Sequence, residues 1–373
     1  MEQDMFVEAH ISDLHFGVIE PLTEYKILTE QFLNYIDSMN VLDIVSINGD
    51  IFDHKLMANS DAIMYTMYFV QNLINICSKK NATLILISGT GSHDAGQLKL
   101  FAPLVGANCD IRIVLETQFI FVKGKKILCI PEDYNRGEEY YDTFLNKSGY
   151  YDSCYMHGTF AGAIFGKNER DLNSNREPVF DIDDFGGCRG PIIAGHVHKN
   201  SVYKNHFYYC GSPIRWCFGE EEDKGFLILL HNLRTRQYLV HLEPIHSFRY
   251  DTINLDHLLN GDPKAIIDYI MNLKQNGIDY VRVKFTKQDT EKITLIKNYF
   301  QNKRDVKIVT DFEKERIKEN LRDMDNQYQQ YDYLFDKNIS TQEKLVQYIN
   351  QVEGSTIWTV ESLATFIDEI KNL

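Results

Sequence analysis

Five short groups of Asp, His and Ser side chains in this 373-residue chain have the composition of metal ligands. In chain order they are Asp13-Leu14-His15, Gly49-Asp50, Ser92-His93-Asp94, His157-Gly158 and Gly195-His196-Val197-His198. Carboxylates and imidazoles gathered at one place suit two divalent cations that share a carboxylate, about 3.5 to 4 Å apart. Such a pair binds a phosphate between its ions and deprotonates the attacking water. One group alone is weak evidence, but the ordered set predicts a dinuclear site with Asp50 as the bridging ligand.

Each group follows an apolar run that is typical of a buried strand. The clearest run is Ile44 to Ile47, rich in β-branched residues, which stops at a glycine followed by Asp50. Open α/β sheets bind their ligands beyond the carboxyl ends of the strands. We therefore expect the five groups to meet at one edge of a sheet.

The first half of the chain alternates strands with helices. Apolar positions at helical spacing predict helices over 22–39 and from about 60 to 77, the second with Ser60 as its N-cap. From about residue 111, short strands replace the helices; we expect them at 111–115, 119–122, 126–130, 151–156, 192–194, 207–210, 226–230 and 238–242. This pattern predicts an α/β fold in which a second sheet packs on a doubly wound one, a four-layer α/β/β/α sandwich.

The C-terminal third has a different organisation. We expect a domain boundary near 248, with a large domain that carries the five groups at 1–248, a small α+β module at 249–316 and a linker at 317–339. Two short amphipathic helices follow at 340–373, the first opened by a capping box at Ser340 and Glu343. Two such helices with no third to cover them require a partner surface, or pack back on their own core.

Composition limits the partners and the compartment. The formal charge of -14 counts against a surface that grips nucleic acid throughout, although residues 274–318 hold 12 basic and 7 acidic residues. Seven cysteines without a C-x-x-C pair argue against a disulfide framework and a zinc knuckle. No apolar run approaches the roughly 18 residues of a membrane span, and the N-terminal residues are acidic where a signal peptide is basic. We expect a cytoplasmic protein with no membrane contact.

Three longer motifs extend the set: Gly49-Asp50-Ile51-Phe52-Asp53, His157-Gly158-Thr159 and Tyr209-Cys210-Gly211-Ser212-Pro213-Ile214. With them, the chain resembles the calcineurin-like metallophosphoesterases, and within these the SbcD exonuclease family. Motifs carry the resemblance over residues 1–248, whereas 249–373 resemble the family only in layout, as a capping domain and a C-terminal helical pair.

The resemblance implies a role for each ligand. It implies that Asp13, His15 and His198 hold one ion, that His157 and His196 hold the other, and that Asp50 bridges them. Manganese is the expected metal, with magnesium possible; zinc and iron also suit ligands of these types.

One loop departs from the family pattern. The family reads G-N-H-D, with its asparagine as a metal ligand, whereas this chain has Ser92 at that position. The resemblance implies that His93 acts on the phosphate or the leaving oxygen, with Asp94 orienting it. A hydroxyl reaches less far than an amide, so Ser92 should bind the second ion weakly or through water. Asp53 and His54 are either a polar pair beside the site or direct substrate contacts.

The activity implied is that of a metal-dependent DNA exonuclease and endonuclease, a subunit of an ATPase–nuclease complex in DNA recombination and repair. The implied partners are DNA and an SbcC-type coiled-coil ATPase docked on residues 340–373; a homodimer is possible. One alternative is a small-molecule or cyclic-nucleotide phosphodiesterase, and another is a scaffold subunit whose catalysis has weakened through Ser92. The sequence leaves open the cleavage polarity, the native metal and a phage or cellular origin.

Overall fold

The computed structural model describes residues 4–106, 109–133, 135–161, 179–220, 222–303, 305–310, 340–353 and 359–371. The predicted linker at 317–339 lies outside these residues. The chain divides into two compact units, one formed by Met1–Thr252 with Asp268–Arg282 and the other by Ile253–Ile267 with Val283–Leu373. The boundaries predicted from the sequence at 248, 316 and 339 stay predictions.

The first unit contains two six-stranded mixed sheets. In sheet order, the first is β14 (Gln237–Pro244), β13 (Gly225–Asn232), β1 (Met5–Ile11), β2 (Ile44–Asn48), β3 (Thr83–Ile87) and β4 (Asp110–Val114). The second is β11 (Ser201–Tyr203), β12 (Phe207–Tyr209), β10 (Ile192–Gly195), β7 (Ser153–His157), β6 (Lys125–Ile130) and β5 (Gln118–Val122). All the strands expected from the sequence in this unit are present.

Parallel pairing brings the carboxyl ends of the central strands together. Strands β1, β2, β3 and β4 are parallel, and so are β12, β10, β7 and β6. The outer strands β13, β14, β5 and β11 pair in the antiparallel direction. The two sheets share a buried core in which Ile44, Ile85 and Ile87 meet Ile127 and Ile193. Loops that follow the parallel strands can therefore meet across the two sheets.

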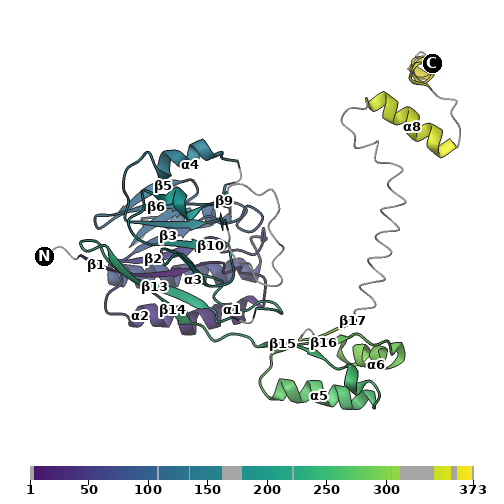
Figure 1. The fold of residues 1–373 in the computed structure, drawn as a ribbon, viewed down its shortest axis with the longest axis horizontal. Coiled ribbons are helices and arrows are strands. Elements are labelled where there is room, and N and C mark those ends of the chain that lie inside the picture. Colours follow the sequence, from purple (N-terminus) through teal and green to yellow (C-terminus); the bar gives the residue numbers. More distant parts are fainter. Residues whose placement is uncertain are drawn as a thin grey trace. The chain divides into compact units, whose positions relative to one another are not determined.

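Helices lie on both sides of the strands, with α4 (Glu138–Leu145) on one side and α1 (Pro21–Leu28) and α2 (Asn34–Ser38) on the other (Figure 1). A π-helical turn at Thr29–Leu33 joins α1 to α2, so the predicted helix over 22–39 is continuous but not uniform. Helix α3 (Asp61–Lys80) begins at the predicted N-cap, where the Ser60 hydroxyl accepts from the amide of Ile63. Helix α4 was not predicted.

The remaining elements are short or belong to the C-terminal third. They are β8 (Thr159–Phe160), β9 (Val179–Phe180), β15 (Tyr250–Asn254), α5 (Pro263–Gln275), β16 (Tyr280–Phe285), α6 (Thr290–Phe300), β17 (Val306–Thr310), α8 (Thr341–Glu353) and α9 (Val360–Lys371), with 3-10 turns at Gln97–Leu104, Ile182–Phe185 and Asp256–Leu258. Strands β15, β16 and β17 form a three-stranded sheet. The predicted capping box is confirmed: Glu343 accepts from the Ser340 amide at 2.9 Å, and its own amide donates to the Ser340 hydroxyl at 3.2 Å.

The fold is thus a mixed α/β fold, as predicted from the sequence. Within the described part of the chain, no helix combines the length and the apolar character needed to cross a membrane.

Candidate metal centre

The predicted ligands stand on sharply turned backbone where the strands end. Asp13, His15 and Asp50 have φ of 53°, 52° and 51°, and His196 has φ of 101°. Residues other than glycine rarely adopt this left-handed region, and each such residue costs on the order of 1 kcal/mol or more. Amides of the first loop fix the turn, since Asp13 donates to the carbonyl of Gly49 and His15 to that of Asp50, both at 3.0 Å.

The structure brings seven predicted residues into three overlapping groups, each with ligand atoms within 4.8 Å of one another. The groups are Asp13, His15 and His198; His15, Asp50 and His93; and Asp50, His157 and His196. His15 and Asp50 each belong to two groups. Such buried clusters can bind metal ions.

Asp50 lies at the centre of the cluster. Its Oδ2 is 3.2 Å from Nε2 of His157 and 3.7 Å from Nε2 of His15. Burial by itself would raise the pKa of Asp50, but the charges of His157, His15 and His93 and the hydrogen bond from His157 together outweigh burial and hold this pKa well below its usual range. The Asp50 carboxylate raises the pKa of His157, against its burial. Asp50 is therefore an ionised carboxylate.

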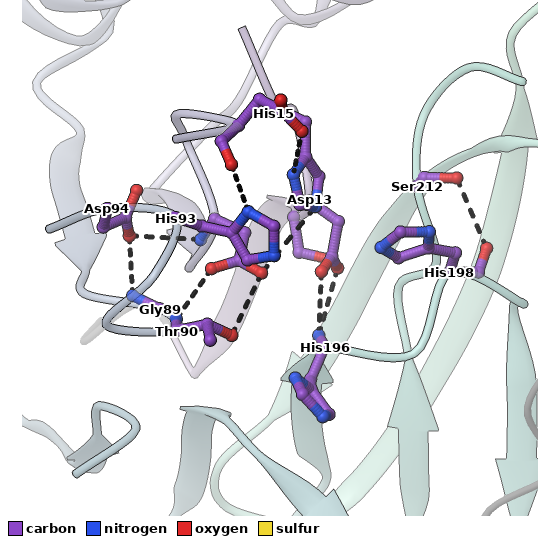
Figure 2. A network of polar contacts seen from close by, with 12 residues as sticks. Asp13, His15, Gly89, Thr90, His93, Asp94, His196, His198 and Ser212 are labelled. Carbon is purple, nitrogen blue, oxygen red and sulfur yellow. Dashed lines mark hydrogen bonds and ion pairs between the residues drawn. The ribbon is translucent and has the colours of Figure 1, made fainter. Parts of the chain in front are cut away.

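Asp13 connects the two sheets at this edge. Its carboxylate accepts from the amide of His196 at 3.0 and 3.1 Å, and Figure 2 shows these two contacts between the loops after β1 and β10. The Ser12 hydroxyl also donates to Asp13 and lies 3.3 Å from the carbonyl of Gly211. These contacts fix the loops of the first sheet against those of the second sheet where the predicted ligands lie.

The imidazoles of His15 and His196 suit cation binding. Burial lowers the pKa of both side chains, so each is a neutral ligand at neutral pH. Both ring nitrogens of His15 are buried without a well-aligned hydrogen bond among the described residues; carboxylate oxygens of Asp53 and Asp50 lie 3.4 Å from Nδ1 and 3.7 Å from Nε2. Buried polar atoms are nearly always paired, and a metal ion is one partner that would satisfy these. The residues present therefore fit a divalent cation.

His93 lies over the same cluster. Its ring is 4.5 Å from the ring of His15, at an interplanar angle of 87°, and its Nδ1 contacts the carbonyl oxygen of Asp53. The Asp53 carboxylate lies 3.4 Å from Nδ1 of His15 and 2.9 Å from Nδ1 of His54. The His54 side chain is 57% exposed. Asp53 therefore supports the cluster, and His54 extends from it toward solvent.

From the sequence we predicted that Asp94 orients His93, but among the described residues the Asp94 carboxylate contacts backbone amides and not the His93 ring. Its carboxylate accepts from four backbone amides, those of Asp50, Ile51, Phe52 and Gly89, at 2.6 to 3.2 Å. Figure 2 shows the carboxylate directed at the Gly89 amide. Burial and the Asp50 carboxylate raise the pKa of Asp94 to about 7, while the amide donors favour its charged form. Asp94 holds together the loops that follow β2 and β3.

Ser92 also departs from the prediction, because its side chain is exposed. The amides of His93 and Asp94 both donate to the carbonyl of Thr90, at 2.9 and 3.0 Å. This tight turn places Gly91 and Ser92 at its tip. Thr90 is buried instead, and its Oγ1 lies 3.3 Å from Oδ2 of Asp50 and 3.4 Å from Nε2 of His157. Thr90 therefore supplies the hydroxyl beside Asp50 and His157 that the sequence assigned to Ser92.

The sequence reasoning missed three further residues at the cluster. Glu132 has its Oε2 3.8 Å from Nε2 of His157 and 3.8 Å from Nδ1 of His196. Trp216 packs edge to face on His15 and His198, with ring centroids 4.6 and 4.7 Å apart. Glu220 Oε1 lies 3.6 Å from Nδ1 of His198. Glu132 follows a predicted strand by two residues, so the strand-end rule could have found it; no sequence signal marked Trp216.

Two glycines allow the loops to approach this closely. A Cβ atom on Gly49 would lie 2.1 Å from Nδ1 of His157, and one on Gly89 would lie 2.2 Å from Oδ1 of Asp50. Real Cβ atoms do not come so near other atoms. Any side chain at either position would displace a residue of the cluster.

Comparisons with known proteins agree with a hydrolytic centre of this kind. No family model matches the chain. The chain is 26% identical over 232 residues to the protein named "Putative phosphoesterase 244L" of Invertebrate iridescent virus 6, which covers 60% of this chain and 75% of the viral protein. With the buried His and Asp clusters, this similarity supports a phosphoesterase-type hydrolase.

Two solved structures are matched with low TM-scores. One solved chain is matched over its full length and 65% of this chain, with 12% identity and a TM-score of 0.38. A protein of unknown function, AQ665 from Aquifex aeolicus, is matched over 81% of its length and 44% of this chain, with 20% identity and a TM-score of 0.22. Scores this low carry no argument about the fold.

Proposed function

We propose that this chain is a metal-dependent phosphodiesterase that hydrolyses DNA, with the four-layer metallophosphoesterase architecture of the SbcD family. The observation that carries the proposal is the meeting of Asp13, His15, Asp50, His157, His196 and His198 around one carboxylate. Two divalent cations, manganese or magnesium, would supply Lewis acidity toward the phosphate and lower the pKa of an attacking water. Asp13, His15 and His198 would hold one ion, His157 and His196 the other, and Asp50 both.

Other residues at the cluster would transfer a proton, position the loops and shield the site from water. His93 is anchored through Nδ1 to the carbonyl of Asp53, so its Nε2 is the nitrogen that can exchange a proton with the leaving oxygen. Asp94 keeps the loop that carries His93 against the loop that carries Asp50, through its four amide contacts. Trp216 covers one side of His15 and His198 and limits the access of water there.

We further propose that DNA is the substrate and that a coiled-coil ATPase of the SbcC type is the partner. Helices α8 and α9 contact one another, and α8 leaves Leu345 and Tyr348 42% and 44% exposed. An amphipathic helical pair with such exposed apolar residues is suited to binding a partner surface. The basic stretch within 274–318 would contribute to the grip on DNA, which the acidic first 250 residues do not provide. A homodimer is a second possible assembly.

The test is digestion of labelled linear and circular DNA by the full chain with Mn²⁺ or Mg²⁺, with and without a co-expressed ATPase. We expect degradation of linear duplex and cleavage of single-stranded circles that require the metal. A soluble phosphate ester and a cyclic nucleotide serve as competing substrates. Turnover of these alone would support a small-molecule phosphodiesterase, and no turnover of any substrate would support a scaffold subunit.

A further inference from the structure

A buried carboxylate that the strand-end motifs left out lies beside the group formed by Asp50, His157 and His196. Glu132 follows strand β6 of the second sheet, and its side chain is only 4% exposed. Its Oε2 lies 3.8 Å from a ring nitrogen of each of the two imidazoles in the group, His157 and His196. A buried carboxylate oxygen equidistant from two imidazole nitrogens is placed as a ligand of the same ion would be.

Thr90 connects this carboxylate to the bridging one. Its Oγ1 donates to Oε2 of Glu132 at 2.6 Å and lies 3.3 Å from Oδ2 of Asp50. Its backbone amide donates to Oδ1 of Asp50 at 2.7 Å. The threonine is 4% exposed, so solvent does not compete for these contacts. Thr90 thereby fixes the Glu132 carboxylate on the same side of Asp50 as the two imidazoles.

We infer that Glu132 is a ligand of the second cation and that Thr90 positions it, so that a carboxylate takes the place where related sites use an amide. The inference rests on the proposed function for the existence of two cations. A glutamate side chain has the length that the Ser92 hydroxyl lacks, and Ser92 lies at the exposed tip of its turn. A second carboxylate also adds negative charge and a hard oxygen donor. The site should therefore bind Mn²⁺ or Mg²⁺ more tightly than it would with a neutral amide in the same place.

The inference is tested by metal binding, independently of turnover. The full chain is stripped with EDTA and titrated with Mn²⁺, with calorimetry measuring the heat and electron paramagnetic resonance measuring free Mn²⁺. We expect two ions per wild-type chain. In Glu132→Ala, which leaves no donor atom, the weaker ion should lose at least about 10- to 100-fold in affinity while the stronger stays bound. Ser92→Ala and the exposed-site control Glu138→Ala should bind as the wild type does.

The outcomes separate this inference from the proposed function. A wild-type chain that takes up no Mn²⁺ refutes the proposed function and this inference with it. Two ions bound equally well by wild type and Glu132→Ala refute the inference alone, and so does a loss of affinity in Ser92→Ala instead.

A second pair of variants covers the case in which Glu132→Ala does not fold, as judged by circular dichroism of the metal-free protein. Thr90→Val removes the hydroxyl that donates to Glu132 and should weaken the second ion, whereas Thr90→Ser keeps that hydroxyl and should restore its binding. Equal binding by the two variants would overturn the positioning role.

Discussion

A buried ion pair between the two sheets allows the most direct test of this structure. Lys125 and Glu8 are each fully buried, and the Lys125 ammonium donates to the Glu8 carboxylate and, at 3.0 Å, to the hydroxyl of Tyr155. Tyr155 also donates to the Glu8 carboxylate, and Nε2 of His10 lies 3.3 Å from Oε2 of Glu8. We predict that Lys125→Met, which keeps the length of the stem, lowers the free energy of unfolding by about 3 to 5 kcal/mol, because it leaves a carboxylate buried without its cation.

The loss of unfolding free energy in Lys125→Met should depend on pH in a defined direction. Burial would raise the pKa of Glu8, but Lys125 and His10 outweigh burial and lower it to about 2. A lowered carboxyl pKa contributes stability above the unfolded value, about 4.5, and this contribution disappears as the pH falls toward 2. Burial lowers the pKa of Lys125, so keeping the ammonium charged inside the protein costs stability. The net contribution of the pair to the free energy of unfolding is therefore smaller than the shift of the Glu8 pKa alone suggests.

Without Lys125, burial would favour the neutral carboxyl. The difference in stability between wild type and Lys125→Met should therefore be larger at pH 7 than at pH 4. The double variant Glu8→Gln/Lys125→Met removes both charges and should recover part of the loss. Urea unfolding of the metal-free chain, followed by circular dichroism, measures each value.

Lys147→Met is the control, because Lys147 forms an ion pair with Asp142 at the surface. This variant should change the urea midpoint of unfolding far less than Lys125→Met does. A loss below about 1 kcal/mol in Lys125→Met, or a double variant less stable than the single one, would refute the reasoning.

Three further predictions concern the candidate metal centre. His93→Gln should reduce hydrolysis of DNA about 10²- to 10⁴-fold without changing the number of Mn²⁺ ions bound, as kinetics and metal titration would show; loss of an ion would instead make His93 a ligand. Gly89→Ala should abolish tight Mn²⁺ binding, because its Cβ would lie 2.2 Å from Oδ1 of Asp50, and Gly91→Ala, whose Cβ meets open space, is the matched control. EDTA should abolish hydrolysis and added Mn²⁺ restore it; activity that survives EDTA would exclude a metal-dependent reaction.

The strands and the convergence of their ends could be predicted from the sequence, because both follow from local patterns. A β-branched run that ends in Gly and Asp predicts where Asp50 lies, and parallel pairing then gathers the other ligands at the same edge. Most of the residues that came together were found in this way.

Loop geometry could not be predicted by the same means. Ser92 and Thr90 are two residues apart, and the backbone contacts that bury Thr90 and expose Ser92 depend on a turn that no periodicity encodes. Asp94 has the spacing of a group that orients His93, but four amides from two loops surround its carboxylate. Helix α4 carries two glutamates in its first turn and few buried residues, so its apolar pattern is short.

The left-handed turns at Asp13, His15, Asp50 and His196 have a consequence for how quickly ions would be taken up. The turns are fixed by contacts between backbone groups, such as those from the amides of Asp13 and His15 to the carbonyls of Gly49 and Asp50. Loading should then require almost no reorganisation of the chain, so crystals grown with and without manganese should superpose closely at this edge. A large displacement of these loops on soaking would show that the cation, and not the backbone, sets their shape.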